Sequence, residues 1–405
     1  MALKVVIIGS GTTSRLGIIR ALAEIKCEIT VIVTSFKDRR GRLNRKKPFD
    51  CYSRYINRVL YIFAGEKEGL IRLLLDECVD LSQKVILLPD TDFSACIIDE
   101  YQNRLSDYFL FPNIHNTPGA IRMWMDKSIQ KSLAEEVGLH YAKSCEITIN
   151  NKQYSIPNSI HYPCFTKPKV SFEGGKNYFR KCDDEEQLKD LLTLAGQKGD
   201  ISIIVEEYLN IETEYALLGF SDGKKVIIPG IIKFICNSKS HFGIAMKGEI
   251  LPPDSFESLI EQFKHYIIKV GFVGVFDIDF YWGDGKWWFG ELNLRFGGSG
   301  YAITKMGVNL PVMLVKLFVG DQWDNGNQKV EDAAVFVNER MCIDDWYRGF
   351  ISTKELRNML KSADISFVND EKDPEPQKAF IRSFKTMWLK KMIKKLREIF
   401  ITNHN

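Results

Sequence analysis

The residues best suited to chemistry lie between positions 277 and 300. Asp277 and Asp279 alternate with apolar residues, as in a strand of period two, and therefore share one face. A turn at 283–285 leads into a second strand that carries Glu291, Asn293 and Arg295 on one face. Carboxylate and amide oxygens, with no thiolate or imidazole among them, suit Mg²⁺ better than Zn²⁺. The hairpin therefore predicts a magnesium site, and the arginine suggests an anion beside the metal.

A single acid on a hairpin is usually solvated, so the surroundings of these acids matter. The polar residues of this hairpin alternate with large apolar ones, among them Phe280, Trp288 and Leu292. Charges in such surroundings are partly desolvated, and a buried charge needs a partner or a metal. Asp277 and Asp279 face the same side, so both are candidates for the metal ligand.

Bulk composition is that of an ordinary globular protein that has room for two or three domains. The chain has 405 residues, 45% hydrophobic and 26% charged, with a net charge of +3. So small a charge argues against a dedicated nucleic-acid binder. Nine cysteines without a C-x-x-C pair indicate neither zinc nor a disulfide framework, and no apolar run reaches the roughly 20 residues that span a bilayer. Together with the absence of a signal-peptide pattern, this predicts a cytoplasmic protein.

The N-terminus reads as an α/β unit. A strand at 4–8 is followed by Gly9, Gly11 and a helical pattern that contains Gly17. This spacing is not G-x-G-x-x-G, and the next strand ends in Thr34 and Ser35 without a ribose-binding acid, so NAD or FAD binding is disfavoured. A Rossmann-like domain is expected, with the segment 89–92 at the carboxyl end of a later strand, where open sheets place ligands.

A basic loop follows the second strand. Seven Lys or Arg residues lie between positions 37 and 47, including Arg39, Arg40 and Arg42. Such a loop is either simply solvated or a site for an anionic sugar, nucleotide or lipid headgroup.

The middle of the chain presents a series of elements that end in polar residues. After a boundary near 116–119, a helix is expected from 120 to 137, with Lys127 in its middle. A strand at 164–169 carries Lys167, and the segment 173–176 contains Gly174 and Gly175, which could bring N–H groups against phosphate. A helix at 183–195 and a buried strand at 201–205 lead to Glu206, and a further strand begins at Glu214.

In this order, the motifs resemble those of the ATP-grasp superfamily of carboxylate–amine ligases, particularly the carbamoyl-phosphate synthetase and D-alanine ligase ATP-binding core. The resemblance covers roughly residues 3 to 320 and rests on several ordered motifs. It implies a two-lobed ATP-grasp fold behind the Rossmann-like domain. The fold class expected is therefore α/β and α+β.

The resemblance also implies roles for particular residues. The implied ATP-binding residues are Lys127, Lys167, Gly174, Gly175, Glu206, Glu207, Leu209 and Glu214, with Glu206 at the adenine amino group and Glu214 at the ribose. The implied metal ligands are Asp279, Glu291 and Asn293, which would hold two Mg²⁺ ions, with Mn²⁺ as a substitute. Arg295 would face the transferred phosphoryl group or the substrate carboxylate, where a planar fork matches two oxygens. Lys167 and Arg295 are the implied catalytic residues.

Three positions depart from the family pattern. Asn177 stands where a third glycine is common, and Leu294 where a proline is common. The segment before Glu214 lacks the usual glycine and is one residue longer, which makes Glu212 a rival for the ribose. None of these changes removes a charge that the chemistry requires.

The predicted domains are a Rossmann-like domain at 1–115, an ATP-grasp domain at 116–320 with its small lobe at 140–205, and a C-terminal extension at 321–405. In the extension, apolar residues at helical spacing alternate with lysines and arginines over 378–400. This basic amphipathic helix either packs on protein, its own domain or a second subunit, or attaches to the anionic inner surface of a membrane.

The function expected from the resemblance is an ATP- and Mg²⁺-dependent ligase. It would activate a small-molecule carboxylate as an acyl phosphate and join it to an amine, with release of ADP and phosphate. The alternatives are an enzyme of the same fold that acts on bicarbonate or amidates a glycan-linked carboxylate such as a uronic acid, an NAD(P)-dependent oxidoreductase, and a silent ATP-binding scaffold. The sequence identifies neither the acid nor the amine.

Overall fold

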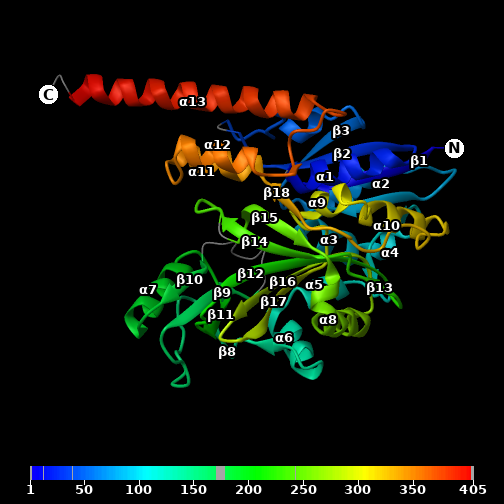
Figure 1. The fold of residues 1–405 in the computed structure, drawn as a ribbon. Coiled ribbons are helices and arrows are strands. Elements are labelled where there is room, and N and C mark those ends of the chain that lie inside the picture. The colour runs from blue at the N-terminus through cyan, green and yellow to red at the C-terminus, as the bar shows by residue number, and fades with distance from the viewer. Residues whose placement is uncertain (1, 12, 39, 170–177, 242, 403–405) are drawn as a thin grey trace.

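A computed structural model describes residues 2–11, 13–38, 40–169, 178–241 and 243–402. Three sheets organise this part of the chain, as Figure 1 shows. The predicted combination of parallel and antiparallel sheets with helices on their faces is confirmed.

The N-terminal sheet is parallel and five-stranded, in the order β3-β2-β1-β4-β5. The chain starts in the middle of this sheet, so the strand order reverses between β1 and β4, and their carboxyl ends frame a crevice. The strands are β1 (Leu3–Gly9), β2 (Cys27–Ser35), β3 (Ile56–Phe63), β4 (Val85–Pro89) and β5 (Phe109–Leu110). Its helices are α1 (Thr13–Ala21), α2 (Lys67–Glu77), α3 (Asp92–Glu100) and α4 (Gln102–Leu105), with short 3-10 turns at Leu22–Glu24 and Phe49–Tyr52.

The small lobe is an antiparallel sheet with its own apolar core. Its strand order is β10-β9-β11-β8, and helix α7 (Glu185–Gly196) covers one face. The strands are β8 (Ser144–Ile149), β9 (Cys164–Pro168), β10 (Arg180–Cys182) and β11 (Ile201–Glu207). In β11 every second side chain points to the same side, so Ile204 and Glu206 share the face that carries Lys167 of β9.

The large sheet has ten strands and joins the other parts of the chain. Its main path is β19-β18-β15-β14-β12-β16-β17-β7, with β13 beside β12 and β6 beside β16. These strands are β6 (Asn113–Ile114), β7 (His140–Tyr141), β12 (Thr213–Asp222), β13 (Val226–Ile227), β14 (Ile231–Asn237), β15 (Ala245–Leu251), β16 (Phe272–Gly283), β17 (Lys286–Asn293), β18 (Ala334–Val337) and β19 (Ile365–Ser366). Segments beyond residue 320 therefore add two strands to the sheet that carries the hairpin.

Helices cover both faces of the large sheet. One apolar core packs α5, α6 and α8 against β12, β16 and β17, and a second is continuous from the N-terminal sheet through α9 and α10 to the other face. The helices are α5 (Ala120–Trp124), α6 (Lys127–Glu136), α8 (Glu257–Val270), α9 (Gly300–Lys305), α10 (Leu310–Phe318), α11 (Glu339–Arg348) and α12 (Thr353–Lys361), with a 3-10 turn at Pro253–Phe256.

The last helix, α13 (Glu375–Thr402), leaves the body of the molecule, as Figure 1 shows in red. Its first turns pack on the N-terminal domain through Phe380, whose ring lies 5.3 Å from that of Phe49, and the ring of Phe384 lies tilted, 5.5 Å from that of Trp346 in α11. None of the helices in the described residues is long and apolar enough to cross a membrane. All nine cysteine thiols are free.

Candidate active site

The hairpin predicted between residues 277 and 300 is present as β16 and β17. Its turn is formed by Asp284 and Gly285, which both have the positive φ that a two-residue hairpin turn requires. Asp279 lies directly opposite Glu291, and Asp277 directly opposite Asn293. The register therefore groups the three predicted metal ligands on two pairs of one ladder that share a face and are separated by the Ile278–Leu292 pair, with Asp277 beside them.

Arg295 follows the hairpin and is held by acidic side chains from two parts of the fold. Its Nε donates to Asp92 Oδ1 at 2.8 Å, at the start of α3, and its Nη1 lies 3.6 Å from Asp277 Oδ2. Its Nη2 also donates to Asn293 Oδ1 at 3.3 Å. Burial raises the pKa of Asp277 to about 6, against the opposing effect of Arg295. Gly297 packs against this carboxylate, because a Cβ there would come within 2.3 Å of Asp277 Oδ2.

Lys127 lies at the start of a helix, not in the middle of one as the sequence predicted. The expected helix over 120–137 is split into α5 and α6, because the side chain of Asp126 accepts a hydrogen bond from Ser128 N and caps a new helix. The side chain of Lys127 is buried, and its Nζ lies 3.0 Å from Glu291 Oε1. A predicted phosphate-binding lysine and a predicted metal ligand are thus in direct contact.

Gln130 fixes α6 to the hairpin. Its side-chain amide donates to the carbonyl of Leu292 at 2.9 Å and accepts from the N–H of Leu292 at 2.9 Å, as a strand neighbour would. It also donates to the carbonyl of Trp124, and Tyr266 donates to its backbone carbonyl. These bonds set the distance between the first turn of α6 and the end of β17, and so between Lys127 and Glu291.

Glu206 holds two lysines. Its Oε1 accepts from Lys167 Nζ at 2.6 Å and also from Lys131 Nζ of α6. Burial opposes ionisation of Glu206, but the two ammonium groups outweigh it and keep the pKa of the carboxyl below its ordinary value. The adenine role of Glu206 stays a prediction, and the structure adds that this carboxylate anchors Lys167.

Tyr281 of β16 shows how closely the predicted residues gather. Its pKa is raised well above the ordinary value, first by burial and then by the carboxylates of Asp279, Glu214, Glu291 and Glu206. These four acids come from four strands in two lobes, β11, β12, β16 and β17, and all act on one phenol. Gly290 makes room for the ring, because a Cβ there would lie 2.8 Å from it.

The hinge between the lobes contains the remaining predicted ATP contacts. Glu207 ties the hinge to the start of β8, because its side chain accepts from Lys143 N at 2.9 Å and its N–H donates to Lys143 O at 2.9 Å. Leu209 follows in the open connection to β12, and its carbonyl accepts from Ile211 N. Glu212 is exposed, while Glu214 is half-buried in β12, opposite Tyr281. Gly174 and Gly175 lie outside the described residues.

The crevice of the N-terminal sheet contains a second buried charge cluster. Arg15 of α1 donates to Asp50 Oδ2 at 2.6 Å and to the carbonyl of Gly9, and all three groups are inaccessible to solvent. Asp90 packs directly on Gly9, where a Cβ would overlap its Oδ1. Its oxygens make no hydrogen bond with the described residues, although the N–H of Ser10 is near enough to lower its pKa slightly. Burial raises the pKa of Asp90 to about 6.

The donor set fits a hard cation. Asp279, Glu291 and Asn293 supply two carboxylates and an amide, which suits Mg²⁺. In the described residues no group of three or more His, Cys, Asp or Glu side chains is placed to hold a metal. The role of these residues as ligands stays a prediction.

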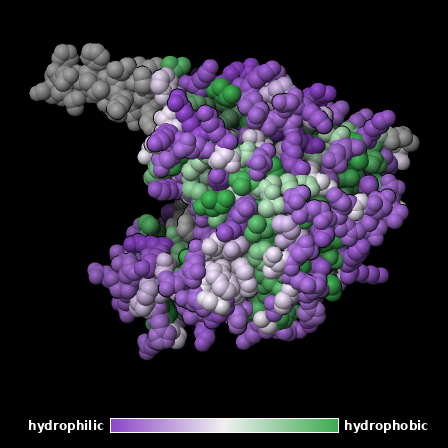
Figure 2. All heavy atoms as spheres, viewed as in Figure 1, coloured by the Kyte–Doolittle hydropathy of each residue, from purple (hydrophilic) through white to green (hydrophobic). Residues whose placement is uncertain are grey.

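Sequence reasoning missed four residues that the structure brings to the site: Lys131, Gln130, Tyr281 and Asp92. Two of them carried a signal. Lys131 lies one helical turn after Lys127, and Asp92 belongs to the segment 89–92 that the sequence placed at a ligand-binding edge. Figure 2 shows that the visible face of the molecule is notched between the small lobe and the region of α11 and α12.

Comparisons with known proteins agree with the fold. Residues 132–308 match the family model of the ATP-grasp domain. The chain is 23% identical over 214 residues to a carbamoyl phosphate synthase large chain from Halomonas eurihalina, covering 52% of this chain and 20% of that protein. It is 24% identical over 264 residues to a D-aspartate ligase from Enterococcus faecium, covering 60% and 61% of the two chains.

Solved structures are similar over most of the chain. An N5-carboxyaminoimidazole synthetase from Staphylococcus aureus, complexed with ADP, superposes with a TM-score of 0.61 at 16% identity and covers 86% of each chain. An L-amino acid ligase from Bacillus licheniformis superposes with a TM-score of 0.60 at 15% identity, covering 83% of this chain and 79% of that one. The likeness in structure shows the fold. The chain spans only a fifth to three fifths of the curated relatives it matches.

Proposed function

We propose that this chain is an ATP-dependent ligase of the ATP-grasp superfamily, whose family model matches residues 132–308. It would join a substrate carboxylate to an amine and release ADP and phosphate. The observation that carries the proposal is the convergence on one site of Lys127, Lys167 and the acids around Tyr281. These residues are far apart in the sequence and come from α6, β9, β11, β12, β16 and β17.

Lys127 and Lys167 would bind the phosphates of ATP. Both ammonium groups now pair with a carboxylate, Lys127 with Glu291 and Lys167 with Glu206. ATP carries about four negative charges, and stabilising phosphoryl transfer depends mainly on positioning and on electrostatics. The two lysines supply positive charge to the site, Lys127 from α6 and Lys167 from β9 of the small lobe. The backbone of Glu207 and Leu209 would meet the adenine, and Glu214 the ribose; the roles of Gly174 and Gly175 rest on the sequence alone.

Asp279, Glu291 and Asn293 would hold Mg²⁺, which when bound neutralises charge on the phosphate oxygens. Their positions on one face of the β16–β17 ladder support this proposal. We also propose that the site holds two Mg²⁺ ions and that Mn²⁺ can replace them. Lys127 would exchange its contact with Glu291 for one with ATP, which leaves the carboxylate for the metal.

Arg295 would orient the acid. A substrate carboxylate oxygen attacks the γ-phosphorus, ADP leaves, and an acyl phosphate results; the amine then attacks the acyl carbon and phosphate leaves. No protein nucleophile is needed. The guanidinium of Arg295 offers a planar fork for a carboxylate or phosphoryl group, and Asp92 fixes its orientation.

The acid is proposed to be an amino acid. The two ligases named above, for D-aspartate and for L-amino acids, support this choice. No feature of the described residues favours a uronic acid, and the dinucleotide alternative still lacks an acid at the end of β2, Cys27–Ser35.

The test is ADP release with panels of amino acids and amines. We expect ADP only when ATP, Mg²⁺, an acid and an amine are all present. Glu291→Gln and Lys167→Met should abolish release, while Lys189→Met, on the exposed surface of α7, should leave it unchanged. Wild-type rates in Glu291→Gln or Lys167→Met would refute the assignment.

A further inference from the structure

Lys131 occupies a place in the site to which neither the sequence nor the proposed reaction assigns a role. It lies one turn after Lys127 on α6 and is 5% exposed. Its Nζ donates to the carbonyl of Ala142 at 3.1 Å and to Oε1 of Glu206. The ammonium group is therefore held between the backbone before β8 and the carboxylate at the end of β11.

The same oxygen of Glu206 also accepts from Lys167. Two ammonium groups therefore share one buried carboxylate, although one would be enough to neutralise it. Lys167 belongs to β9 and is the lysine that the proposed reaction needs at the phosphates. If Lys167 were the only positive charge beside Glu206, it could not move away, because the buried carboxylate would then be left unpaired, which is strongly unfavourable.

We infer that Lys131 is a positioning residue that keeps Glu206 neutralised and so allows Lys167 to turn from Glu206 to the phosphates of ATP. This inference rests on the proposed function, because it takes ATP as the ligand of Lys167. Lys131 is suited to the task because it comes from α6, whose position is fixed by Gln130, and because its second bond goes to a backbone carbonyl.

The surroundings of Lys131 make its charge sensitive to pH. Lys127 faces it from α6, Lys167 from β9 and Glu206 from β11. On its other side a cavity of about 310 Å³ opens, lined by Tyr141, Lys143, Glu146 and the serines of α6 and β8. Burial lowers the pKa of Lys131 to about 8, against the opposing effect of Glu206. Above that pH the ammonium is lost and Glu206 depends on Lys167 alone.

The experiment measures the Kd of Mg²⁺–ATP by calorimetry, which needs neither the acid nor the amine. Lys131→Met should weaken ATP binding by about ten- to a hundredfold. Lys131→Met combined with Glu206→Gln should bind ATP as the Glu206→Gln protein does, because the charge to be compensated is gone. Lys189→Met, exposed on α7 and outside the site, should match the wild type.

The pH profile gives the second readout. Between pH 7 and 9 ATP binding should weaken in the wild type and stay level in Lys131→Arg, because a guanidinium keeps its proton. Thermal unfolding shows which variants fold. If Lys131→Met does not fold, the pH profiles of ATP binding in the wild type and in Lys131→Arg test the inference. Equal Kd values for the wild type and Lys131→Met, or equal pH profiles for the wild type and Lys131→Arg, would overturn the inference. A wild type that binds no ATP would instead refute the proposed function.

Discussion

Arg295 donates to Asp92 across 203 positions of sequence, at 2.8 Å, and so joins the hairpin to the N-terminal domain. A hydrogen bond between two charged groups is worth about 1.5–3 kcal/mol. Asp92→Asn should therefore let Arg295 turn away and lower kcat/KM for the acid by about ten- to a hundredfold. The Kd of ATP should stay the same, because Asp92 lies at the edge of the N-terminal sheet and not beside the lysines.

Steady-state kinetics of ADP release with the acid varied measure this effect. Asp107→Asn serves as a control, because Asp107 is exposed and lies in the same domain. Unchanged kcat/KM in Asp92→Asn would show that Arg295 is oriented by Asp277 and Asn293 alone.

Gln130 is expected to matter for stability as much as for activity. Gln130→Ala removes three side-chain hydrogen bonds and leaves the N–H and carbonyl of Leu292 buried without a partner. Each such group costs about 1–3 kcal/mol. We expect a loss of about 2–5 kcal/mol in the free energy of unfolding by urea.

Gln197→Ala is the matched control, since this glutamine is exposed at the end of α7, and it should change the free energy of unfolding by less than about 0.5 kcal/mol. A loss that small in Gln130→Ala would mean that water replaces the amide. In that case α6 would not depend on Gln130 for its position.

The hairpin was predictable because its signals are local. Period-two alternation and the Gly-Asp-Gly turn fix which residues face each other, so the pairing of Asp279 with Glu291 follows once the turn is placed. The sequence also carried a signal for the break before Lys127, since aspartate, here Asp126, is a favoured N-cap residue. The break was missed because the helical spacing of apolar residues continues across it.

The contacts of Lys131 and Arg295 were not predictable in this way. Lys131 meets Glu206 from 75 positions away, and Arg295 meets Asp92 only because two domains pack together. Periodicity tells which face a residue occupies but not which distant residue lies opposite. The domain boundaries predicted at 115 and 320 stay a proposal, although β18 and β19 show that residues beyond 320 complete the large sheet.

Asp90 should make stability depend on pH. Its pKa in the folded protein is about 6, above the value of about 3.9 in an unfolded chain. The folded state thus binds more protons between about pH 4 and 6, so the stability contributed by this group is lost as the pH rises through that window. Asp90→Asn removes the titration and should be more stable than the wild type by about 1–3 kcal/mol at pH 7.5.

Urea unfolding of both proteins at pH 4 and 7.5 measures the difference, which should shrink or reverse at pH 4. Asp321→Asn, an exposed residue, controls for the change of charge. A difference that is the same at both pH values would show that Asp90 is ionised throughout, with Arg15 as its counter-charge.

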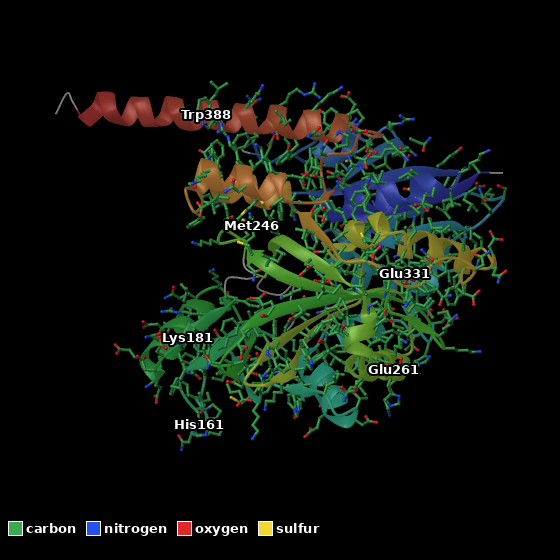
Figure 3. The ribbon with its side chains drawn as sticks, in the orientation of Figure 1. His161, Lys181, Met246, Glu261, Glu331 and Trp388 are labelled. Carbon is green, nitrogen blue, oxygen red and sulfur yellow. The ribbon has the colours of Figure 1, made fainter. Side chains whose placement is uncertain are left out.

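The last prediction concerns α13, for which we propose peripheral attachment to an anionic membrane. Its sequence holds eight basic and two acidic residues, and Ile381, Trp388 and Leu389 are exposed. Figure 3 shows Trp388 on the part of α13 beyond the sheets. A basic residue near an anionic surface contributes about 1 kcal/mol of binding. Lys394→Glu with Lys395→Glu should therefore reduce pelleting with phosphatidylserine vesicles at least tenfold.

The matched control is Lys189→Glu with Lys198→Glu. Both lysines are exposed on the small lobe, and the double substitution changes the net charge by the same amount. Vesicles of phosphatidylcholine alone should pellet neither the wild type nor the variants, because they offer no net negative surface. Equal pelleting of the wild type and Lys394→Glu/Lys395→Glu would refute attachment through α13. A change in molar mass of that variant in light scattering would show instead that α13 packs on a second subunit.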